Sequence, residues 1–436
     1  MEVSVASVAI IGSGISGLSA AYSLDKDFDV HVFEQDDRPG GHASTVVVSD
    51  PLGDVGVDTG FMVFNPPNYP KLTKFFAELN VPLTEHSGGF NFFDVDAGTY
   101  YGTEEFEKDE AYVRANYGPE FISVWEQADR LLREAPRHIM EGKCQIPLEE
   151  YLRTYGYTDD FINGYMIQIS CSYWSVPVEV TLNSPAVMVI GMFLNHGKDG
   201  LGGKGVKWLA VKGGAKGYLD ILIGGLKRPP RLNAAVTSVR ALADGVEVQT
   251  GGSWEKFDYA IVATHADQAL KLLDNPSVKQ REILGTFEYN RCSTVLHTDS
   301  SVMPVPPHRW KSWNYGCMTV DGKRRPYLVY HMNSIQGFKA EQDYFVSLDS
   351  PLPIDPAKVI KTFDYEHPVI TIESSKMQAR LPSINDDGPL YFAGSYFSVR
   401  DLGPDFVGFH ESGVYSGTQA ARLVKRHAAA PIGKTA

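Results

Sequence analysis

The feature that most constrains this chain is a glycine-rich turn close to its first residues. Residues 5–11 form an apolar, β-branched run that is typical of a buried parallel strand. The run leads into residues 12–17, GSGISG, then into small and apolar residues at helical spacing, and then into a second strand, 29–33, that ends at Glu34. A strand, a glycine turn, a helix, a strand and an acid within about 30 residues make up the βαβ unit of the dinucleotide-binding fingerprint.

Each position of this fingerprint has a physical role. Gly12 permits the tight turn, Gly14 lets the backbone approach a pyrophosphate, and Gly17 allows the helix to pack closely on the strand. The helix N-terminus offers N–H groups and partial positive charge to the phosphates. Glu34 lies 22 residues after Gly12, near the spacing of about 20 for an acid that binds a ribose diol and disfavours a 2′-phosphate. A GxGxxG run without this context could equally be a plain turn.

A second glycine pair favours a flavin dinucleotide over a nicotinamide one. Residues 38–42, RPGGH, follow the acid, and residues 57–65, VDTGFMVFN, come shortly after. A flavin extends past the first βαβ unit and needs such a turn; the alternative is a glycine turn between a strand and a loop. With G-x-G-x-x-G, E and R-x-G-G in this order, the chain resembles the flavin-containing amine oxidase and phytoene desaturase superfamily. The resemblance implies FAD as the cofactor.

The rest of the chain predicts two interleaved domains. Apolar residues recur at helical spacing over residues 69–79, 118–140, 147–155 and 159–169, so we expect a mostly helical insertion. The strand period returns at 208–211. The glycine group at 213–217 that follows it is interpreted as a return crossover into the cofactor domain, and a small β-meander comes next. The predicted fold class is α/β, with a Rossmann-type FAD-binding domain interleaved with a mixed α+β substrate domain, amine-oxidase-like. Residues 1–65, 206–265 and 385–430 are assigned to the first domain, 66–205 and 266–384 to the second, and 431–436 to a tail.

Further motifs resemble one branch of the superfamily. Segments 58–65 with 69–70, 296–299, 313–315, 367–369, 391–394 and 408–411 occur in an order that looks like flavoproteins encoded beside, or fused to, methyltransferases of the cyclopropane-fatty-acyl-phospholipid synthase type. This resemblance covers the chain to about residue 426. Two departures fall near the expected substrate side. The segment between residues 394 and 408 is longer than in the branch and adds Arg400 and Asp401, and His331 stands where the branch has Trp. The cofactor therefore carries over, whereas the branch's substrate does not.

The fingerprint and the resemblance together imply site residues. His410 is placed at the flavin pyrimidine edge, where a helix N-terminus would stabilise the charge of a reduced flavin. His331, Tyr330 and Tyr396 are candidate catalytic groups, although each could instead be structural. Tyr173, Trp174, Trp313 and Tyr315 are candidate substrate-binding aromatics. The expected cofactor-binding residues are Gly12, Ser13, Gly14, Ile15, Gly17, Glu34, Gln35, Arg38, Gly40, Gly41, His42, Gly60, Phe61, Met62, Val236, Thr264, Gly394, Ser395, Gly408, Phe409 and His410.

Composition narrows the class further. With 40 Lys+Arg against 53 Asp+Glu, the net charge of −13 argues against nucleic acid or an anionic membrane as a partner. The four cysteines form no CxxC pair, and no metal-ligand spacing occurs in the sequence. A signal peptide would require Lys or Arg near its start, but none precedes Lys26. No apolar run approaches the length of about 20 residues that a membrane span needs. We expect a cytoplasmic protein without a metal, with peripheral membrane contact and oligomeric state left open.

Three functions stay open from the sequence. The first is an FAD-dependent oxidoreductase that takes a hydride from a substrate C–H onto flavin N5 and desaturates a fatty acyl chain or isomerises its double bond, with oxygen or another acceptor reoxidising the flavin. The second is an amine or amino-acid oxidase that produces hydrogen peroxide. The third is a non-catalytic flavoprotein partner of a lipid methyltransferase. The fold does not decide among them, because function has to be argued from the site.

Overall fold

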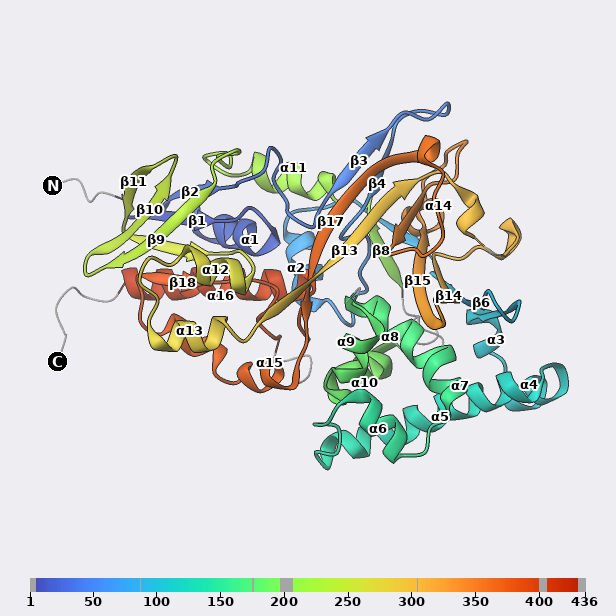
Figure 1. The fold of residues 1–436 in the computed structure, drawn as a ribbon. Helices are drawn as coiled ribbons and strands as arrows, with labels where there is room; N and C mark the ends of the chain where they lie inside the picture. The colour runs from blue at the N-terminus through green and yellow to red at the C-terminus, as the bar shows by residue number, and fades with distance from the viewer. Residues whose placement is uncertain are drawn as a thin grey trace.

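A parallel sheet of four strands carries the glycine-rich turn. The computed structural model describes residues 5–86, 88–174, 176–196, 207–303, 305–399 and 406–429. The sheet has the order β18 (Leu390–Phe392), β12 (Tyr259–Val262), β1 (Ser7–Ile11) and β2 (Asp29–Phe33), and it lies in the left half of Figure 1. Segments far apart in the sequence therefore meet in one sheet, whose strands are apolar because both faces are covered.

Two layers cover the faces of this sheet. On one face, Val8 and Ile10 pack with α1 (Ile15–Leu24) and α16 (His410–Ala428). On the other face, Ala9 and Ile11 pack with an antiparallel sheet of β9 (Val236–Leu242), β10 (Gly245–Thr250) and β11 (Ser253–Phe257), beside α12 (Ala266–Leu272) and α13 (Val278–Leu284). Successive side chains of β1 therefore pack alternately into the two layers. The predicted α/β fold class with a Rossmann-type domain is confirmed.

A larger, mostly antiparallel sheet forms the other half of the molecule. Its order is β17, β13, β16, β15, β14, β6 and β7, in which β14 and β6 are parallel neighbours. Strands β13 and β17 run side by side from the centre of Figure 1. The bounds are β17 (Val359–Val369), β13 (Glu288–His297), β16 (Phe345–Leu348), β15 (Lys323–His331), β14 (Trp313–Val320), β6 (Phe90–Asp94) and β7 (Thr99–Gly102).

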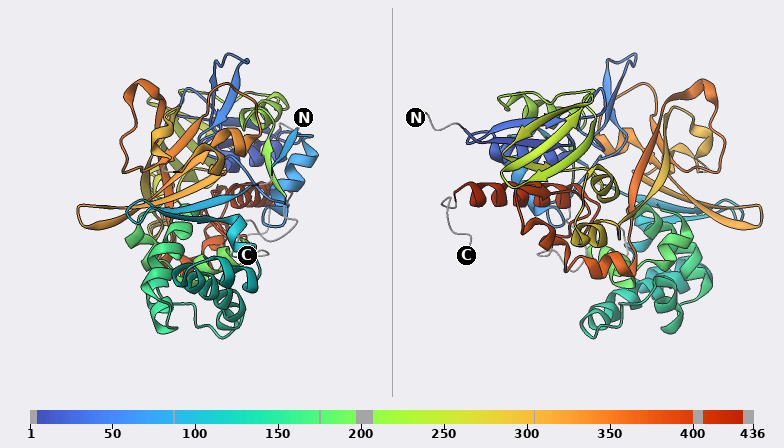
Figure 2. Two further views of the ribbon diagram at one scale, coloured as in Figure 1. Left: turned by 90° about the vertical axis from the view of Figure 1, so that its right-hand side faces the viewer. Right: turned by 60° about the vertical axis from the view of Figure 1, so that its left-hand side comes forward.

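The expected helical insertion also contains strands. Most of its helices form a block below the large sheet (Figure 2), whereas α2 (Pro70–Glu78) packs on α16. Strands β6 and β7 belong to the large sheet. The run Phe90–Asp94 of β6 is buried on both faces, so its sequence shows neither a helical period nor the alternation of a half-buried strand. The helices are α2 (Pro70–Glu78), α3 (Thr103–Phe106), α4 (Glu110–Asn116), α5 (Pro119–Met140), α6 (Leu148–Thr154), α7 (Asp159–Phe161), α8 (Ile167–Trp174), α9 (Val178–Asn183) and α10 (Ala186–His196), with a π-helical turn Ile162–Met166 between α7 and α8.

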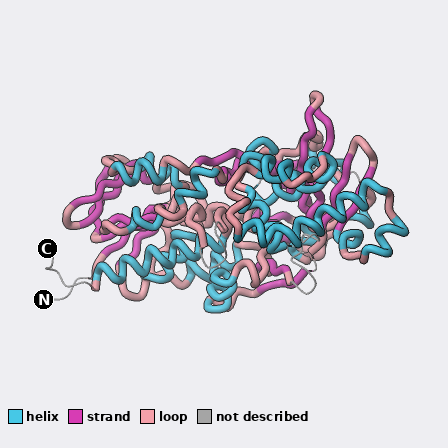
Figure 3. Tube along the Cα trace, turned by 90° about the horizontal axis from the view of Figure 1, so that it is seen from below, coloured by secondary structure: helices cyan, strands magenta, loops and turns pink. Residues whose placement is uncertain are grey.

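Strand β8 (Trp208–Val211) lies outside the parallel sheet. It pairs with β5 (Leu83–His86) in a two-stranded sheet separate from the parallel one, and the next helix, α11 (Lys216–Gly224), contacts α1. A hairpin of β3 (Thr45–Val48) and β4 (Val55–Asp58) and the short helices α14 (Met332–Gln336) and α15 (Ile372–Met377) complete the main elements. Seen from below, the molecule is elongated (Figure 3). Within the described ranges, none of the helices is both long and apolar enough to cross a bilayer.

Candidate functional site

The first glycine turn holds α1 tightly against the end of β1. Gly12 has a φ of +99°, and a Cβ there would lie 2.8 Å from the carbonyl oxygen of Ala263. A Cβ on Gly17 would lie 1.9 Å from the carbonyl oxygen of Gly12. Gly14 differs, because a Cβ there would meet no described atom within 4 Å. The protein's own packing therefore requires Gly12 and Gly17, whereas Gly14 faces open space at the start of α1.

The acid at the end of β2 is tied to this turn. Glu34 accepts hydrogen bonds from the backbone N–H of Ser13 at 3.0 Å and from its hydroxyl at 2.5 Å. Its other oxygen accepts from the backbone N–H of Asp36 at 3.1 Å. These contacts fix the carboxylate beside the turn, at the place where the fingerprint requires an acid for a ribose diol.

The second glycine turn crosses in front of the first. The backbone N–H of Gly40 donates to the carbonyl oxygen of Ser13 at 3.0 Å, and Gly40 and Gly41 have φ values of +108° and +57°. The Arg38 guanidinium donates to the carbonyl oxygens of Gly41 at 2.9 Å and Ala43 at 3.4 Å. The Arg38 side chain thus stabilises the conformation of the second glycine turn.

A cavity of about 1040 Å³ begins at these turns and extends between the two halves of the molecule. Two predicted cofactor-binding residues do not line it: Ser13 lies behind it and holds Glu34, and Gly17 lies in the contact of α1 with the turn. The structure brings the others together around this one space. They are Gly12, Gly14, Ile15, Glu34, Gln35, Arg38, Gly40, Gly41, His42, Gly60, Phe61, Met62, Val236, Thr264, Gly394, Ser395, Gly408, Phe409 and His410.

The start of α16 closes the cavity at the end away from Glu34. His410 is the first residue of this helix, stacks on Phe61 with ring centroids 3.7 Å apart, and shares a hydrogen bond of 3.1 Å with the Tyr218 hydroxyl. The next residue, Glu411, accepts from the backbone N–H groups of Lys71 and Leu72 at 2.8 and 2.7 Å, so it anchors α16 to the start of α2. His410 is therefore held by a ring and a hydroxyl and cannot swing away from the cavity.

The predicted substrate-side aromatics are divided by the structure. Trp174, Trp313 and Tyr330 line the cavity, and the Trp174 indole N–H donates to the carbonyl oxygen of Val407 at 3.1 Å. Tyr315 lies outside the lining and stacks on Phe92 with centroids 5.0 Å apart. The side chain of Tyr173 lies outside the described residues, as do Arg400 and Asp401.

Two predicted catalytic residues lie away from the cavity. Tyr330 and His331 are neighbours on β15, and alternation along a strand turns them to opposite faces. The His331 ring hydrogen-bonds with Ser334 at 2.8 Å and Asp343 at 3.0 Å. Tyr396 packs on the Phe287 ring and lines a separate void of about 10 Å³. The expectation that His331 and Tyr396 lie at the site is therefore wrong in placement, and Tyr330 is the candidate that remains.

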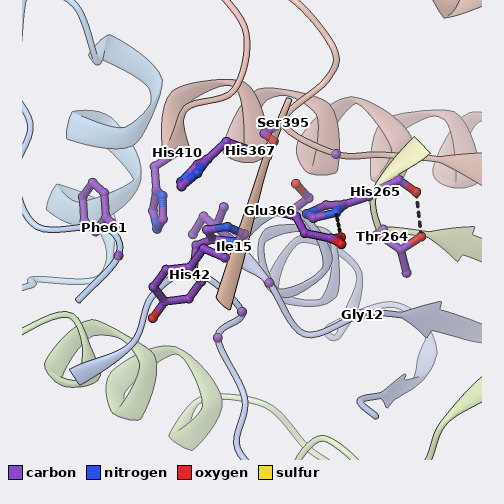
Figure 4. A pocket seen from close by; sticks show the side chains of 18 of the residues that line it. Gly12, Ile15, His42, Phe61, Thr264, His265, Glu366, His367, Ser395 and His410 are labelled. Atoms are coloured by element: carbon purple, nitrogen blue, oxygen red, sulfur yellow. Dashed lines mark hydrogen bonds and ion pairs between the residues drawn. The ribbon is translucent and has the colours of Figure 1, made fainter. Parts of the chain in front are cut away.

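Several cavity residues are not among the site residues predicted from the sequence. His265, Glu366 and His367 line the cavity with His42 (Figure 4), and Tyr365 lines it as well. The resemblance to the superfamily implies that residues 263–265, which follow β12, close the site, but it assigns no role to His265. The other three residues lie on β17, where the sequence motifs include only residues 367–369. Alternation of Phe363, Tyr365 and His367 on one face of β17 was the available signal, but it does not reveal which element that face meets.

Burial sets the charge state of these histidines. It lowers the pKa of His410 to about 3 and of His367 to about 4. Burial, reinforced by the neighbouring His367, lowers the pKa of His42 well below its ordinary value. Burial also lowers the pKa of His265, and the nearby Glu366 carboxylate offsets part of that shift. The four imidazoles are therefore neutral near pH 7 in the free protein.

A buried acid beside the cavity wall links several elements. Asp58 ends β4 and accepts from the Thr45 hydroxyl at 2.5 Å, the Ala215 backbone N–H at 2.8 Å and the Gln336 amide at 3.0 Å. Burial raises the pKa of Asp58 to about 7. Its contacts connect β4, the start of α11 and α14, so this carboxyl is a structural junction.

The cavity fits an extended dinucleotide. At one end it offers a fixed acid, an uncrowded Gly14 and a helix start that no side chain caps. Toward the other end it offers imidazole nitrogens of His42, His265 and His367 that are buried without a hydrogen-bond partner among the described residues. The aromatic wall of Trp174, Trp313 and Tyr330 leaves an apolar face for a further molecule.

Comparisons with known proteins agree with this architecture. A family model described as an NAD(P)-binding Rossmann-like domain matches residues 10–79. The structure is similar to that of a CLA-producing fatty acid isomerase from P. acnes, with a TM-score of 0.65 and 16% identity over 96% of this chain and 98% of that chain. It is also similar to putrescine oxidase bound to putrescine (TM-score 0.69, 15% identity, 97% of this chain and 99% of that chain). A third similar structure is cyclohexylamine oxidase from Brevibacterium oxydans IH-35A (TM-score 0.68, 16% identity, 97% and 99%).

No curated protein sequence matches the chain. At these identities, the likeness to the solved structures shows a common fold. The prediction of an amine-oxidase-like architecture is confirmed by it.

Proposed function

We propose that this chain is an FAD-dependent oxidoreductase that desaturates a fatty-acyl-like substrate or isomerises its double bond. The observation that carries the proposal is the single cavity that joins the dinucleotide fingerprint to an aromatic wall. The similarity to a fatty acid isomerase supports the acyl substrate, and the similarity to amine oxidases supports oxidoreductase chemistry.

The chain's residues suggest how the cofactor would be held. Glu34 would bind the adenosine ribose, and the start of α1 at Gly14 would receive the diphosphate. Gly60, Phe61 and His410 would hold the flavin end, with the N-terminus of α16 directed at it. When bound, FAD supplies an acceptor for a hydride from a substrate C–H.

The aromatic wall would position the substrate. Trp313 and Tyr330 offer ring faces to an apolar chain and exclude water from the reacting carbon. The Tyr330 hydroxyl is buried, which raises the pKa of Tyr330, so it orients a substrate as a neutral donor. The cavity histidines are uncharged near pH 7, because burial lowers their pKa values, so they offer hydrogen bonds to a ligand without adding charge to the site.

Amine oxidation is the second candidate function. The rings of Trp174, Trp313 and Tyr330 line the same wall and could enclose an amine, and cations bind favourably to such faces. Asp364 and Glu366 also line the cavity and would attract a protonated amine to it. The two candidates use the same wall, so they differ in the substrate and not in the site.

Anaerobic reduction of the flavin separates the two candidates. The holoprotein is mixed with oleic or linoleic acid, or with putrescine or cyclohexylamine, while the absorbance of oxidised flavin is followed and fatty acid products are identified by mass spectrometry. The proposal predicts bleaching or a changed double bond with the fatty acids and no bleaching with the amines. Bleaching with the amines alone, and hydrogen peroxide when those mixtures are then opened to air, would establish the second candidate. No change with either class would contradict both.

Other expectations from the sequence stay predictions. Association with a lipid methyltransferase, oxygen as the acceptor and a cytoplasmic location are not addressed by any described contact. The domain boundaries proposed from the sequence likewise await limited proteolysis.

A further inference from the structure

Three histidines from separate segments meet on one wall of the cavity. His42 comes from the loop after β2, His265 directly precedes α12, and His367 lies on β17 (Figure 4). The His42 ring centroid lies 5.9 Å from that of His265 and 5.5 Å from that of His367. We name these three residues the histidine cluster.

The histidine cluster adjoins the fingerprint turn. His42 follows Gly41, where a Cβ would lie 3.5 Å from the Cα of Gly14. His265 comes two residues after Ala263, whose carbonyl oxygen would be 2.8 Å from a Cβ on Gly12. Both imidazoles are therefore carried on backbone that contacts the turn where a diphosphate would bind.

Two members of the histidine cluster have an unsatisfied nitrogen. Nε2 of His42 and Nδ1 of His367 are buried and make no hydrogen bond within the described part of the chain. Nδ1 of His265 makes no hydrogen bond either, but it lies 3.5 Å from a carboxylate oxygen of Glu366, with which it forms an ion pair when protonated. A buried polar atom without a partner costs about 1–3 kcal/mol. The two partnerless atoms on one wall indicate that a ligand supplies the missing partners.

The charges lining the cavity do not by themselves suit a dianion. Four carboxylates line it, on Glu34, Asp36, Asp364 and Glu366, against three permanent cations, on Arg38, Lys271 and Arg291. The lining therefore carries a net charge of −1 (three minus four) while its histidines are neutral. A diphosphate adds about two further negative charges, so the site needs additional positive charge once the ligand is present.

We propose that the histidine cluster takes up protons when the dinucleotide binds and then serves as the counter-charge of its diphosphate. The inference rests on the proposed function, since it requires FAD in this cavity, and it adds a pH-dependent step of cofactor loading. An imidazolium donates from both nitrogens, so protonation gives each orphaned atom an N–H that can donate to a diphosphate oxygen.

The surroundings of the cluster favour neutral imidazoles until the diphosphate arrives. Glu366 is the carboxylate beside His265, but Arg291 lies 3.5 Å from that carboxylate and competes for it. The groups that face the cluster are Glu366, Tyr365 and Arg291 from the large sheet, Tyr289 stacked on His265, Asp267 and Lys271 from α12, Arg38 from the loop, and His410 from α16.

The sign of the pH dependence follows from linkage. The free protein holds these histidines with lowered pKa values, so they are neutral near pH 7. A nearby diphosphate raises their pKa values, so the complex binds more protons than the free protein between the two sets of values. FAD affinity must then rise as the pH falls through that window. Each proton taken up changes the dissociation constant about tenfold per pH unit.

Calorimetry on the full-length apoprotein tests the proposal. FAD is titrated in at pH 7 in two buffers of different ionisation enthalpy, and the dissociation constant is measured from pH 6 to 8 by quenching of flavin fluorescence. We expect uptake of about one proton and a dissociation constant that rises about three- to tenfold per pH unit. Tight FAD binding with no proton uptake and a flat pH profile would overturn the proposal and leave the proposed function intact. Absence of FAD binding at every pH would overturn both.

Variants assign the proton to the cluster. His42→Gln, His265→Gln and His367→Gln, singly and together, are compared with His308→Gln, whose side chain is exposed and lies outside the cavity lining. The triple variant should lose the proton uptake and the pH slope while it still binds FAD more weakly, and the control should retain both. Full proton uptake in the triple variant would contradict the proposal. The wild-type proton count stands by itself if a variant fails to fold.

Discussion

The two ends of the cavity are built in opposite ways. The end at the parallel sheet is made largely of backbone from one short segment, with Gly12, Gly14, Gly40 and Gly41 at its wall. The end at the large sheet is made of side chains, such as those of Trp313 and Tyr330, which pair across the hairpin of β14 and β15. Backbone recognises what all dinucleotides share, whereas side chains can change without disturbing it. The cofactor end should therefore tolerate few substitutions, and the substrate end should tolerate many.

The largest expected effect is a difference in stability between variants of two glycines in the same turn. Gly17→Ala places a Cβ 1.9 Å from the Gly12 carbonyl oxygen, a clash that costs at least about 3 kcal/mol and outweighs the gain of about 1 kcal/mol in helix propensity. Gly14→Ala meets no described atom within 4 Å, so it should unfold like wild type and lose FAD affinity about tenfold or more. Thermal unfolding of the apoproteins and FAD titration check both. Equal thermal stability of the two variants would contradict this account of the turn.

The junction at Asp58 should make stability depend on pH. Its pKa is raised to about 7 by burial, so between pH 4 and 7 the folded state holds a proton that the unfolded state has lost. Stability therefore falls as the pH rises through this window, by on the order of 4 kcal/mol, and Asp58→Asn should remove that loss. Unfolding midpoints from pH 4 to 8 test this, with the exposed Asp387→Asn as the control. The same pH slope in wild type and Asp58→Asn would rule it out.

A change at the aromatic wall should affect the substrate and spare the cofactor. Trp313→Ala removes a ring that lines the cavity, so we expect about a tenfold lower kcat/KM on the substrate class that reduces the flavin. FAD affinity should change less than about twofold, because Trp313 lies at the substrate end. Trp254→Ala, on β11 outside the lining, is the control. Loss of FAD binding in Trp313→Ala would contradict the claim that separate ends of the cavity bind the cofactor and the substrate.

The smallest expected effect concerns the support of Glu34. Ser13→Ala removes the 2.5 Å hydroxyl contact to the carboxylate but keeps the backbone N–H contact, so FAD affinity should fall only about two- to fivefold. Ser23→Ala on α1, whose hydroxyl donates to the Ser19 carbonyl oxygen, should leave affinity unchanged. Fluorescence titration measures the FAD affinity of both variants. A loss of affinity in Ser13→Ala as large as that in Gly14→Ala would show that the Ser13 hydroxyl alone holds the Glu34 carboxylate in place.

The same contrast explains what the sequence could predict. The turn, Glu34 and the second glycine pair are close in sequence, and their spacing alone implies the βαβ geometry. The histidine cluster depends on where β17 meets the loop after β2, which no local pattern encodes. Tyr330 and His331 were both chosen as catalytic, although on β15 alternation leaves Tyr330 at the cavity and turns His331 toward Ser334 and Asp343. Strand β6 was missed because a strand buried on both faces shows no period.

The central claim is that the cavity holds one FAD. Flavin released from the purified and reconstituted chain by denaturation, identified by mass and quantified by absorbance, tests it most directly. The account predicts one FAD per chain and no comparable retention of NAD or NADP. A chain that binds no flavin after reconstitution, or that retains a nicotinamide dinucleotide in its place, would contradict it.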